Sequence, residues 1–163
     1  MTAQVGIKIR EFAPGDAEAF RKLNEEWIQH YFELEGPDRE VLNDPQGAIL
    51  DRGGRIFVAE RNGELVGCCA LLAGHEGEYE VAKMAVAPEC RGAGIGRRVL
   101  EYAIAAAREL GASRLTLETN RKLAVAIGLY ESVGFQHIPA SRLPPSPYAR
   151  CDVAMEMFLS KPH

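Results

Sequence analysis

The sequence predicts a single mixed α+β domain, in which helices pack on both faces of a mostly antiparallel, twisted sheet of about six to seven strands. Two observations carry this prediction. The chain has 163 residues, which suits one domain with a substantial core, and no long linker divides it. The order of its patterns is a helical N-terminal part, an antiparallel meander, and then strand–helix–strand–helix–strand. We therefore expect residues 1–163 to form one domain.

The N-terminal part should contain one strand followed by helices. Residues 7–12 resemble a strand. Asp16 is expected to cap a helix whose apolar residues recur at helical spacing: Phe20, Leu23, Trp27 and Tyr31. A second short helix should follow Pro37, and Asp44-Pro45 should open another turn.

The meander is marked by a hairpin signal. Residues 55–60 and 64–73 are apolar runs joined across Asn62-Gly63, and Asn-Gly between such runs favours a tight hairpin turn. Residues 78–86 form a third run that Pro88 closes.

The second half alternates helices with strands and includes a proline-rich segment at 139–147, which we interpret as a surface crossover. The expected elements are helix 95–110, strand 114–119, helix 122–133, strand 135–138 and strand 153–159.

Composition narrows the range of functions. The formal net charge of −4 gives no basic footprint for nucleic acid, so no nucleic-acid partner is expected. Residues 91–98 nevertheless contain three arginines and no acid, which indicates a small anionic ligand. Neither the cysteines nor the histidines have metal-ligand spacing, so no metal is expected. Neighbours Cys68 and Cys69 should point to opposite faces of a strand.

Two sequence features bear on where the protein is expected to reside. The N-terminus lacks an apolar signal-peptide core, and the longest uncharged apolar stretch, residues 65–74, is about half of what spans a bilayer. We therefore expect a cytoplasmic protein with no membrane partner.

The most informative segment is a glycine-rich turn between a strand and a helix, with glycines at 92, 94 and 96. Free N–H groups at a helix start bind phosphates, and glycine lets the backbone approach the ligand closely. A dinucleotide fingerprint is disfavoured because Arg97 occupies the place of its third glycine, and a P-loop is disfavoured because Gly-Lys-Ser/Thr is missing. A merely tight turn is the remaining alternative.

The turn, read as Arg91-Gly-Ala-Gly94-Ile-Gly96, resembles the phosphate-binding signature of the GNAT superfamily of acetyltransferases. A second motif of that superfamily is an alanine-rich helix with a tyrosine shortly before Gly-Phe. Ala126-Ile-Gly-Leu-Tyr130-Glu-Ser-Val-Gly-Phe135 matches it closely. The resemblance covers about residues 55–138 and implies a GNAT-like fold. It also implies transfer of an acetyl group from acetyl-CoA, as co-substrate, to an amine.

The resemblance further implies a set of cofactor contacts. The turn would bind the CoA pyrophosphate through Arg91, Gly92, Ala93, Gly94, Ile95, Gly96 and Arg97. The backbone of Met84, Ala85 and Val86 would pair with the pantetheine arm, with an N–H near Met84 facing the acetyl carbonyl. Many members carry an asparagine where this chain has Leu123. Asn120 is the nearby candidate, with a helix N-cap as its alternative role.

Two catalytic residues follow from the resemblance. Tyr130 would sit near the CoA sulfur as general acid, its alternative being an ordinary core tyrosine. Glu80 lies where the histone-acetylating branch has a general base, its alternative being a solvated strand-end charge. Without a bulge, strand alternation would place Glu80, Ala82, Met84 and Val86 on one face.

The acceptor amine, on a small molecule or a protein, is not identified by the sequence. The resemblance implies that the first helical region forms one wall of its cleft, with Tyr31 and Glu35 as candidates; core packing is the alternative for the stripe Trp27, Tyr31 and Phe32. Glu118, Tyr148 and Arg150 are further candidates. A non-catalytic acyl-CoA-binding sensor is the alternative function, and a homodimer is left open.

Overall fold

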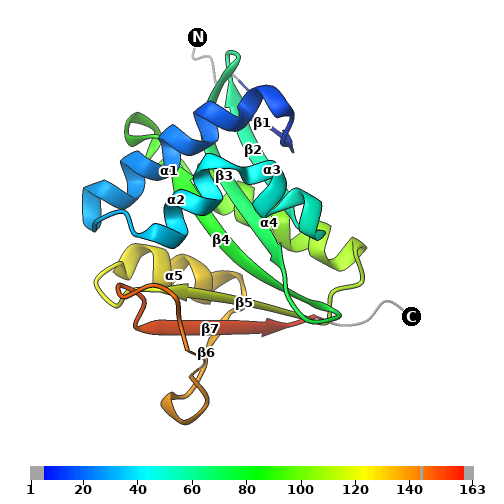
Figure 1. The fold of residues 1–163 in the computed structure, drawn as a ribbon, viewed down its shortest axis with the longest axis vertical. Coiled ribbons are helices and arrows are strands. Elements are labelled where there is room, and N and C mark those ends of the chain that lie inside the picture. The colour runs from blue at the N-terminus through cyan, green and yellow to red at the C-terminus, as the bar shows by residue number, and fades with distance from the viewer. Residues whose placement is uncertain (1–5, 144, 160–163) are drawn as a thin grey trace.

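The computed structural model describes residues 6–143 and 145–159, which form one sheet with helices on both faces (Figure 1). The sheet has seven strands in the order β1-β2-β3-β4-β5-β7-β6. The strands are β1 (Lys8–Glu11), β2 (Arg55–Arg61), β3 (Glu64–Ala73), β4 (Glu78–Val86), β5 (Arg114–Thr119), β6 (Gln136–His137) and β7 (Val153–Phe158). The helices are α1 (Ala17–Tyr31), α2 (Gly36–Asn43), α3 (Pro45–Ala48), α4 (Ile95–Glu109) and α5 (Ala124–Val133). The predicted fold class is confirmed: all neighbouring strands are antiparallel except β4 and β5.

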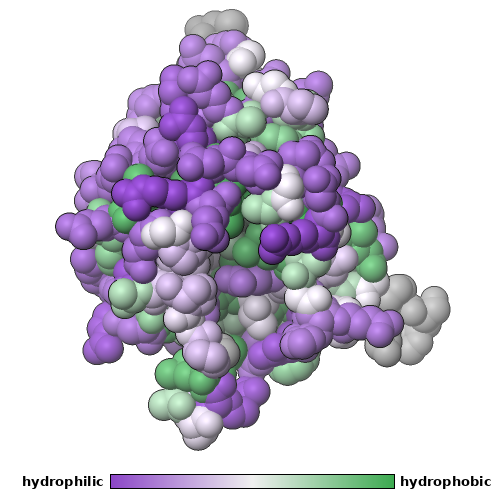
Figure 2. Space-filling view, viewed as in Figure 1, coloured by the Kyte–Doolittle hydropathy of each residue, from purple (hydrophilic) through white to green (hydrophobic). Residues whose placement is uncertain are grey.

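Two apolar cores flank the sheet. Helices α1 to α3 cover one face, with Phe20 and Leu42 packed on sheet residues such as Cys68. Helices α4 and α5 cover the other face, which includes Cys69. The two neighbouring cysteines therefore lie on opposite faces, as strand alternation predicts. Figure 2 shows the outer surface over α1 and α2 as mostly hydrophilic, as expected of helices that bury only one side.

Local turns shift several element boundaries from their predicted positions. Helix α5 begins at Ala124, two residues late, because the Asn120 side chain accepts a hydrogen bond from Lys122 N (2.9 Å) and holds a turn there. Strand β6 keeps only two of its four expected residues. Asp16 precedes α1, but its carboxylate accepts from Ala13 N and Arg10 and caps no N–H of that helix.

A bulge interrupts β4 at Lys83, whose φ of +53° is unusual for a residue other than glycine. Along β3 the register moves two residues from Cys68 to Ala70, while along β4 it moves three, from Ala85 to Ala82. The condition under which Glu80, Ala82, Met84 and Val86 were expected to share a face, an unbulged strand, is therefore not met. Glu80 lies opposite Leu72 on the α1 side, whereas Val86 lies opposite Gly67 on the α4 side.

Strands β4 and β5 pair only where they begin. Three parallel pairs join them, from Glu78 with Arg114 to Glu80 with Thr116. Beyond Glu80, β4 continues through its bulge without pairing to β5, and β5 continues along β7 as far as Thr119. The sheet therefore opens at its centre, next to the bulge.

Candidate functional site

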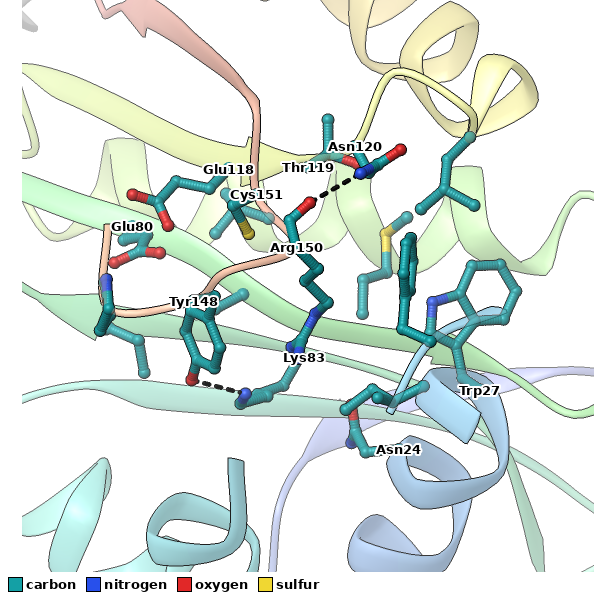
Figure 3. A pocket seen from close by; sticks show the side chains of 18 of the residues that line it. Asn24, Trp27, Glu80, Lys83, Glu118, Thr119, Asn120, Tyr148, Arg150 and Cys151 are labelled. Atoms are coloured by element: carbon teal, nitrogen blue, oxygen red, sulfur yellow. Dashed lines mark hydrogen bonds between the residues drawn. The ribbon is translucent and has the colours of Figure 1, made fainter. Parts of the chain in front are cut away.

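A cavity of about 230 Å³ lies where β4 and β5 diverge (Figure 3). Its walls come from α1, the end of β3, β4, β5, the turn before α5, α5 itself and the crossover between β6 and β7. The polar or ionisable residues that line it are Asn24, Glu80, Lys83, Glu118, Thr119, Asn120, Tyr130, Tyr148, Arg150 and Cys151. Trp27, Ile28, Phe32, Leu72, Met84 and Leu123 supply most of the apolar lining. This mixture suits a small molecule whose polar groups are recognised individually.

Glu80 places an accessible carboxylate in this cavity. No described residue donates a hydrogen bond to it, whereas Glu118 accepts one from Ser146 Oγ (2.7 Å). Burial raises the pKa of Glu80 to about 7. The negative charge of Glu118 acts in the same direction, and the positive charge of Lys83 opposes both. A carboxylate with a pKa near neutrality, and with no partner among the described residues, suits a general base.

The raised pKa of Glu80 predicts a pH-dependent stability. The pKa of Glu80 is about 7 in the folded protein, against an ordinary value of 4.5, so the folded state loses stability relative to the unfolded state as the pH rises from 4.5 to about 7. Its contribution is therefore favourable at low pH and is lost as the pH rises through 7. We expect Glu80→Gln to raise the free energy of unfolding by roughly 2 kcal/mol more at pH 8 than at pH 4.5. Unfolding of both proteins by chemical denaturant at the two pH values measures this difference. Glu64→Gln, at an exposed β3 position, is the control. Equal effects of Glu80→Gln at both pH values would contradict the shifted titration.

Tyr130 belongs both to the core and to the cavity. Its ring packs edge-to-face on Phe135, with 6.1 Å between ring centroids, and only 9% of the residue is exposed. Its hydroxyl has no hydrogen-bond partner among the described residues, yet no described side-chain polar atom is both buried and unsatisfied. The hydroxyl therefore opens to the cavity that Tyr130 lines. Burial raises the pKa of Tyr130, so the group keeps its proton at neutral pH and can donate a hydrogen bond.

The glycine turn joins the bulged strand to α4. Gly92 has φ +87° and Gly94 has φ +80°, and a Cβ built on either one would meet nothing within 4 Å. Gly94 is the N-cap of α4. Among the described residues, the backbone N–H groups of residues 94–97 have no backbone acceptor, and the first to find one is Arg98, to Gly94 O (3.2 Å). The turn thus offers open space lined by N–H donors at a helix start, which suits a phosphate.

The arginines of this segment point in different directions. Arg91 binds Glu26 (2.5 Å) and stacks over Trp27 (4.8 Å), so it ties the turn to α1 beside the cavity. Arg97 donates to Ser132 Oγ of α5 (2.6 Å). Arg98 donates to Ile7 O near β1 (3.2 Å), away from the cavity.

The remaining predicted site residues are divided between the cavity and its surroundings. Asn120 lines the cavity and donates to Arg150 O (2.7 Å); the N-cap position of α5 belongs to Leu123. Glu118 and Tyr148 line it as well, whereas Tyr31 does not and instead packs edge-to-face on Trp27.

The backbone positions expected to meet the pantetheine arm straddle the sheet. Met84 lines the cavity and Ala85 is buried on the α1 side, while Val86 points to the α4 side.

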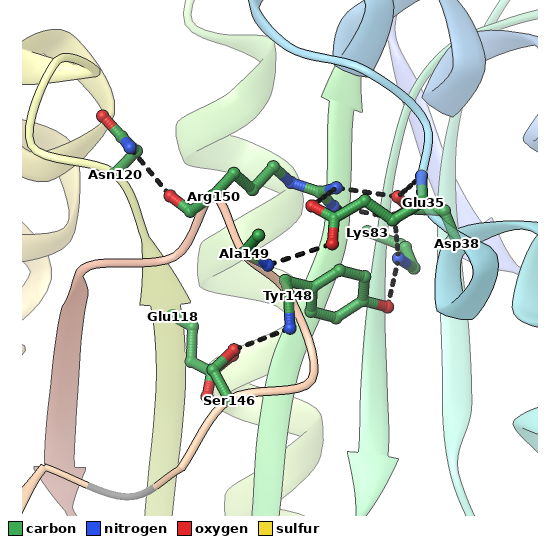
Figure 4. Close-up of polar contacts among 9 residues, drawn as sticks. All are labelled: Glu35, Asp38, Lys83, Glu118, Asn120, Ser146, Tyr148, Ala149 and Arg150. Carbon is green, nitrogen blue, oxygen red and sulfur yellow. Dashed lines mark hydrogen bonds and ion pairs between the residues drawn. The ribbon is translucent and has the colours of Figure 1, made fainter.

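Sequence reasoning missed a buried charge cluster beside the cavity, shown in Figure 4. The Asp38 carboxylate of α2 is fully buried and accepts from Lys83 Nζ (2.8 Å) and from both guanidinium NH groups of Arg150 (2.7 Å each). Burial alone would raise the pKa of Asp38, but the hydrogen bonds from Arg150, Lys83 and Glu35 N outweigh it and lower the pKa to about 2. Glu35 lies outside the cavity lining and holds the same crossover by accepting from Ala149 N (3.0 Å).

Within residues 6–143 and 145–159, no group of three or more His, Cys, Asp or Glu side chains could hold a metal ion. No helix in the described part of the chain is long and apolar enough to cross a membrane.

Comparison with known proteins identifies a family and several relatives of this chain. A family model described as the acetyltransferase (GNAT) family matches residues 18–135. An IAA acetyltransferase of Azospirillum brasilense is 43% identical over 109 residues, which are 66% of this chain and 67% of that protein. The uncharacterized N-acetyltransferase YjgM of Escherichia coli is 42% identical over 53% of each chain, so the match spans about half of that relative.

Solved structures agree on the fold. An acetyltransferase of the GNAT family from Staphylococcus aureus superimposes with a TM-score of 0.86 at 22% identity, covering 95% of this chain and 100% of that one. A phosphinothricin acetyltransferase from Sinorhizobium meliloti, in complex with AcCoA, gives a TM-score of 0.76 at 19% identity and covers 94% and 88%. At these identities the likeness concerns the fold alone.

Proposed function

Because the chain belongs to the acetyltransferase (GNAT) family, we propose that it transfers the acetyl group of acetyl-CoA to an amine by direct attack. The observation that carries the proposal is the pairing of Glu80 with Tyr130 in one cavity. The first is a carboxylate with a pKa of about 7 and the second a protonated hydroxyl, both open to the cavity. The amine belongs to a small molecule or a protein.

The two residues would assist two proton transfers, one from the attacking amine and one to the departing thiolate. An alkylamine has a pKa near 10.4, so exposing its lone pair at pH 7 costs roughly 4–5 kcal/mol. Glu80, directly or through a water, would accept that proton. A departing thiolate with a pKa of about 8.5 needs only about 2 kcal/mol of help at pH 7, which Tyr130 would give by donating its proton.

The chain's residues fit acetyl-CoA. The N–H groups of residues 94–97 and the open space at Gly92 and Gly94 would receive the pyrophosphate, with Arg91 and Arg97 nearby. The backbone of Met84, Ala85 and Val86, beside the divergence of β4 from β5, would pair with the pantetheine arm. Asn120 lines the cavity from the β5 side.

The turn predicts a cofactor-specific stabilisation. Acetyl-CoA at about 100 times its dissociation constant should add roughly 2.7 kcal/mol of stability by mass action. In a domain of this size the melting temperature should rise by about 5–10 °C, whereas ATP and NADH should shift it far less. Thermal melts with all three ligands measure this. Equal shifts would show that the turn does not recognise CoA.

Release of free thiol from acetyl-CoA in the presence of an amine panel, with mass detection of the acetylated product, tests the proposed reaction. A catalyst should release one thiol for each product amide. A non-catalytic acyl-CoA-binding sensor would show the thermal shift without turnover.

We also propose that the chain acts as one domain in the cytoplasm. The four cysteines are unpaired, which suits a reducing compartment.

A further inference from the structure

Tyr148 lies on the crossover between β6 and β7 and lines the cavity. Its hydroxyl oxygen accepts a hydrogen bond from Lys83 Nζ (2.9 Å), and the same ammonium also donates to Asp38 (2.8 Å) (Figures 3 and 4). Lys83 therefore connects the bulge of β4 to both the crossover and α2.

The direction of that hydrogen bond fixes what Tyr148 can offer. An ammonium group only donates, so the phenolic oxygen must accept, and the proton of Tyr148 is left for another partner. Lys83 is the only described residue that hydrogen-bonds the hydroxyl. Burial raises the pKa of Tyr148, so the hydroxyl keeps its proton at neutral pH. The hydroxyl proton is therefore available to a hydrogen-bond acceptor bound in the cavity that Tyr148 lines.

The charges around the ring favour an oxygen acceptor. Lys83 Nζ lies 4.7 Å and the Arg150 guanidinium 4.5 Å from the ring centroid of Tyr148. Asp38 accepts hydrogen bonds from both cations and offsets part of their charge. The Lys83 ammonium that hydrogen-bonds the phenolic oxygen therefore contributes most to polarising the O–H bond toward an oxygen acceptor.

The crossover holds this donor in place. Ala149 N donates to Glu35 (3.0 Å), Arg150 donates to Asp38, and Asn120 donates to Arg150 O (2.7 Å). A donor fixed by neighbours on both sides is pre-organised, so a substrate that lacks a matching acceptor cannot be accommodated by a simple rearrangement.

We propose that Tyr148 is a specificity-determining residue, whose hydroxyl donates a hydrogen bond to a carbonyl or carboxylate oxygen of the acceptor molecule. The enzyme should therefore prefer amines that carry such an oxygen over hydrocarbon amines of the same shape. This inference rests on the proposed acetyltransferase function and names the substrate class of the same site.

The test compares matched primary amines. For the side chains of alanine, leucine and phenylalanine, the series contains the amino acid, its amide, and the amine in which an isopropyl group replaces the carboxamide. We expect kcat/KM to be about 10- to 100-fold higher for at least one oxygen-bearing form than for its hydrocarbon analogue. Whether the amino acid or the amide is preferred distinguishes a carboxylate from a carbonyl partner.

Tyr148→Phe supplies the second measurement. It should lower kcat/KM for the preferred oxygen-bearing amine by about 10- to 100-fold and change the hydrocarbon analogue by less than about threefold. Because each amine is compared with itself, differences in amine pKa cancel. Tyr102→Phe, on the opposite side of the sheet, is the control and should change neither.

The outcomes separate the two proposals. A wild-type enzyme that acetylates both members of each pair equally overturns the role of Tyr148, even if the variant cannot be folded. An equal loss for both members in Tyr148→Phe overturns it too, and in both cases acetyl transfer stands. No acetylation of any amine, with acetyl-CoA bound, overturns the proposed function and this inference together.

Discussion

Glu80→Gln should lower kcat by about 10²–10⁴-fold near pH 7 while leaving the affinity for acetyl-CoA unchanged. Glutamine keeps the shape of the side chain but cannot accept the proton of the attacking amine. The wild-type kcat/KM should decrease as the pH is lowered past about 7, because protonation of Glu80, whose pKa is about 7, removes the base. This effect should be the largest of any single substitution in the cavity, because deprotonating the attacking amine is the costlier of the two proton transfers.

The dependence on pH identifies the role. The defect of Glu80→Gln should shrink as the pH climbs toward the amine pKa, since solution then deprotonates the substrate. Tyr130→Phe should show a smaller defect that does not shrink as the pH rises. The departing CoA thiolate needs a proton, and alkaline solution supplies less acid to provide it. Glu118→Gln is the matched carboxylate control. It removes a negative charge that raises the pKa of Glu80, so it should move the acidic limb to lower pH.

Turnover against pH for the three variants, on an amine found by the panel, measures these effects. A Glu80→Gln defect that stays flat with pH, or below about fivefold throughout, would assign the proton to another group such as Glu118 or an ordered water.

Gly94→Val should abolish measurable acetyl-CoA binding while the protein stays folded. Gly94 has φ +80°, which a β-branched residue rarely adopts, and its side chain would project into the open space proposed for phosphate. No atom of the protein lies within 4 Å of the new Cβ, so the substitution creates no clash in the core. Backbone strain should cost about 1–2 kcal/mol of stability.

Gly111→Val is the matched control for Gly94→Val. Gly111 has φ +81°, an equally open surrounding, and a place just beyond the other end of α4. Both variants should lose similar stability in circular dichroism melts, but only Gly94→Val should lose binding in calorimetric titration with acetyl-CoA. A folded Gly94→Val protein with unchanged affinity would show that the glycines serve only the turn.

Local features of the site could be predicted from the sequence, because neighbouring residues determine them. Asn62 and Gly63 both adopt positive φ in the hairpin between β2 and β3, as Asn-Gly indicates. Gly92 and Gly94 adopt positive φ at the turn, where the motif required glycine. Glycine and asparagine adopt positive φ more readily than other residues, so their positions in the sequence indicate these turns directly.

Features that depend on distant residues could not be predicted. Lys83 adopts a positive φ without any local signal, and its ammonium is bound by Asp38, 45 positions away in the chain. Arg150 meets the same carboxylate across 112 positions. The choice between Tyr31 and Trp27 as a cavity wall depends on how α1 is rotated against the sheet, which apolar spacing leaves undetermined.

The short pairing between β4 and β5 makes the geometry of the reaction a property of the whole sheet. Glu80 belongs to the half that ends with β4, and Tyr130 follows β5 in the other half. The angle between the two half-sheets therefore sets the separation of the proposed proton acceptor and donor. That angle is held where the two strands begin, by three backbone pairs, the last of which is Glu80 with Thr116, and by Arg114, which bridges Glu78 and Glu156. Glu78, Arg114 and Glu156 do not line the cavity, yet they help to set its geometry. Substitutions among them should therefore change turnover with every cavity residue unchanged.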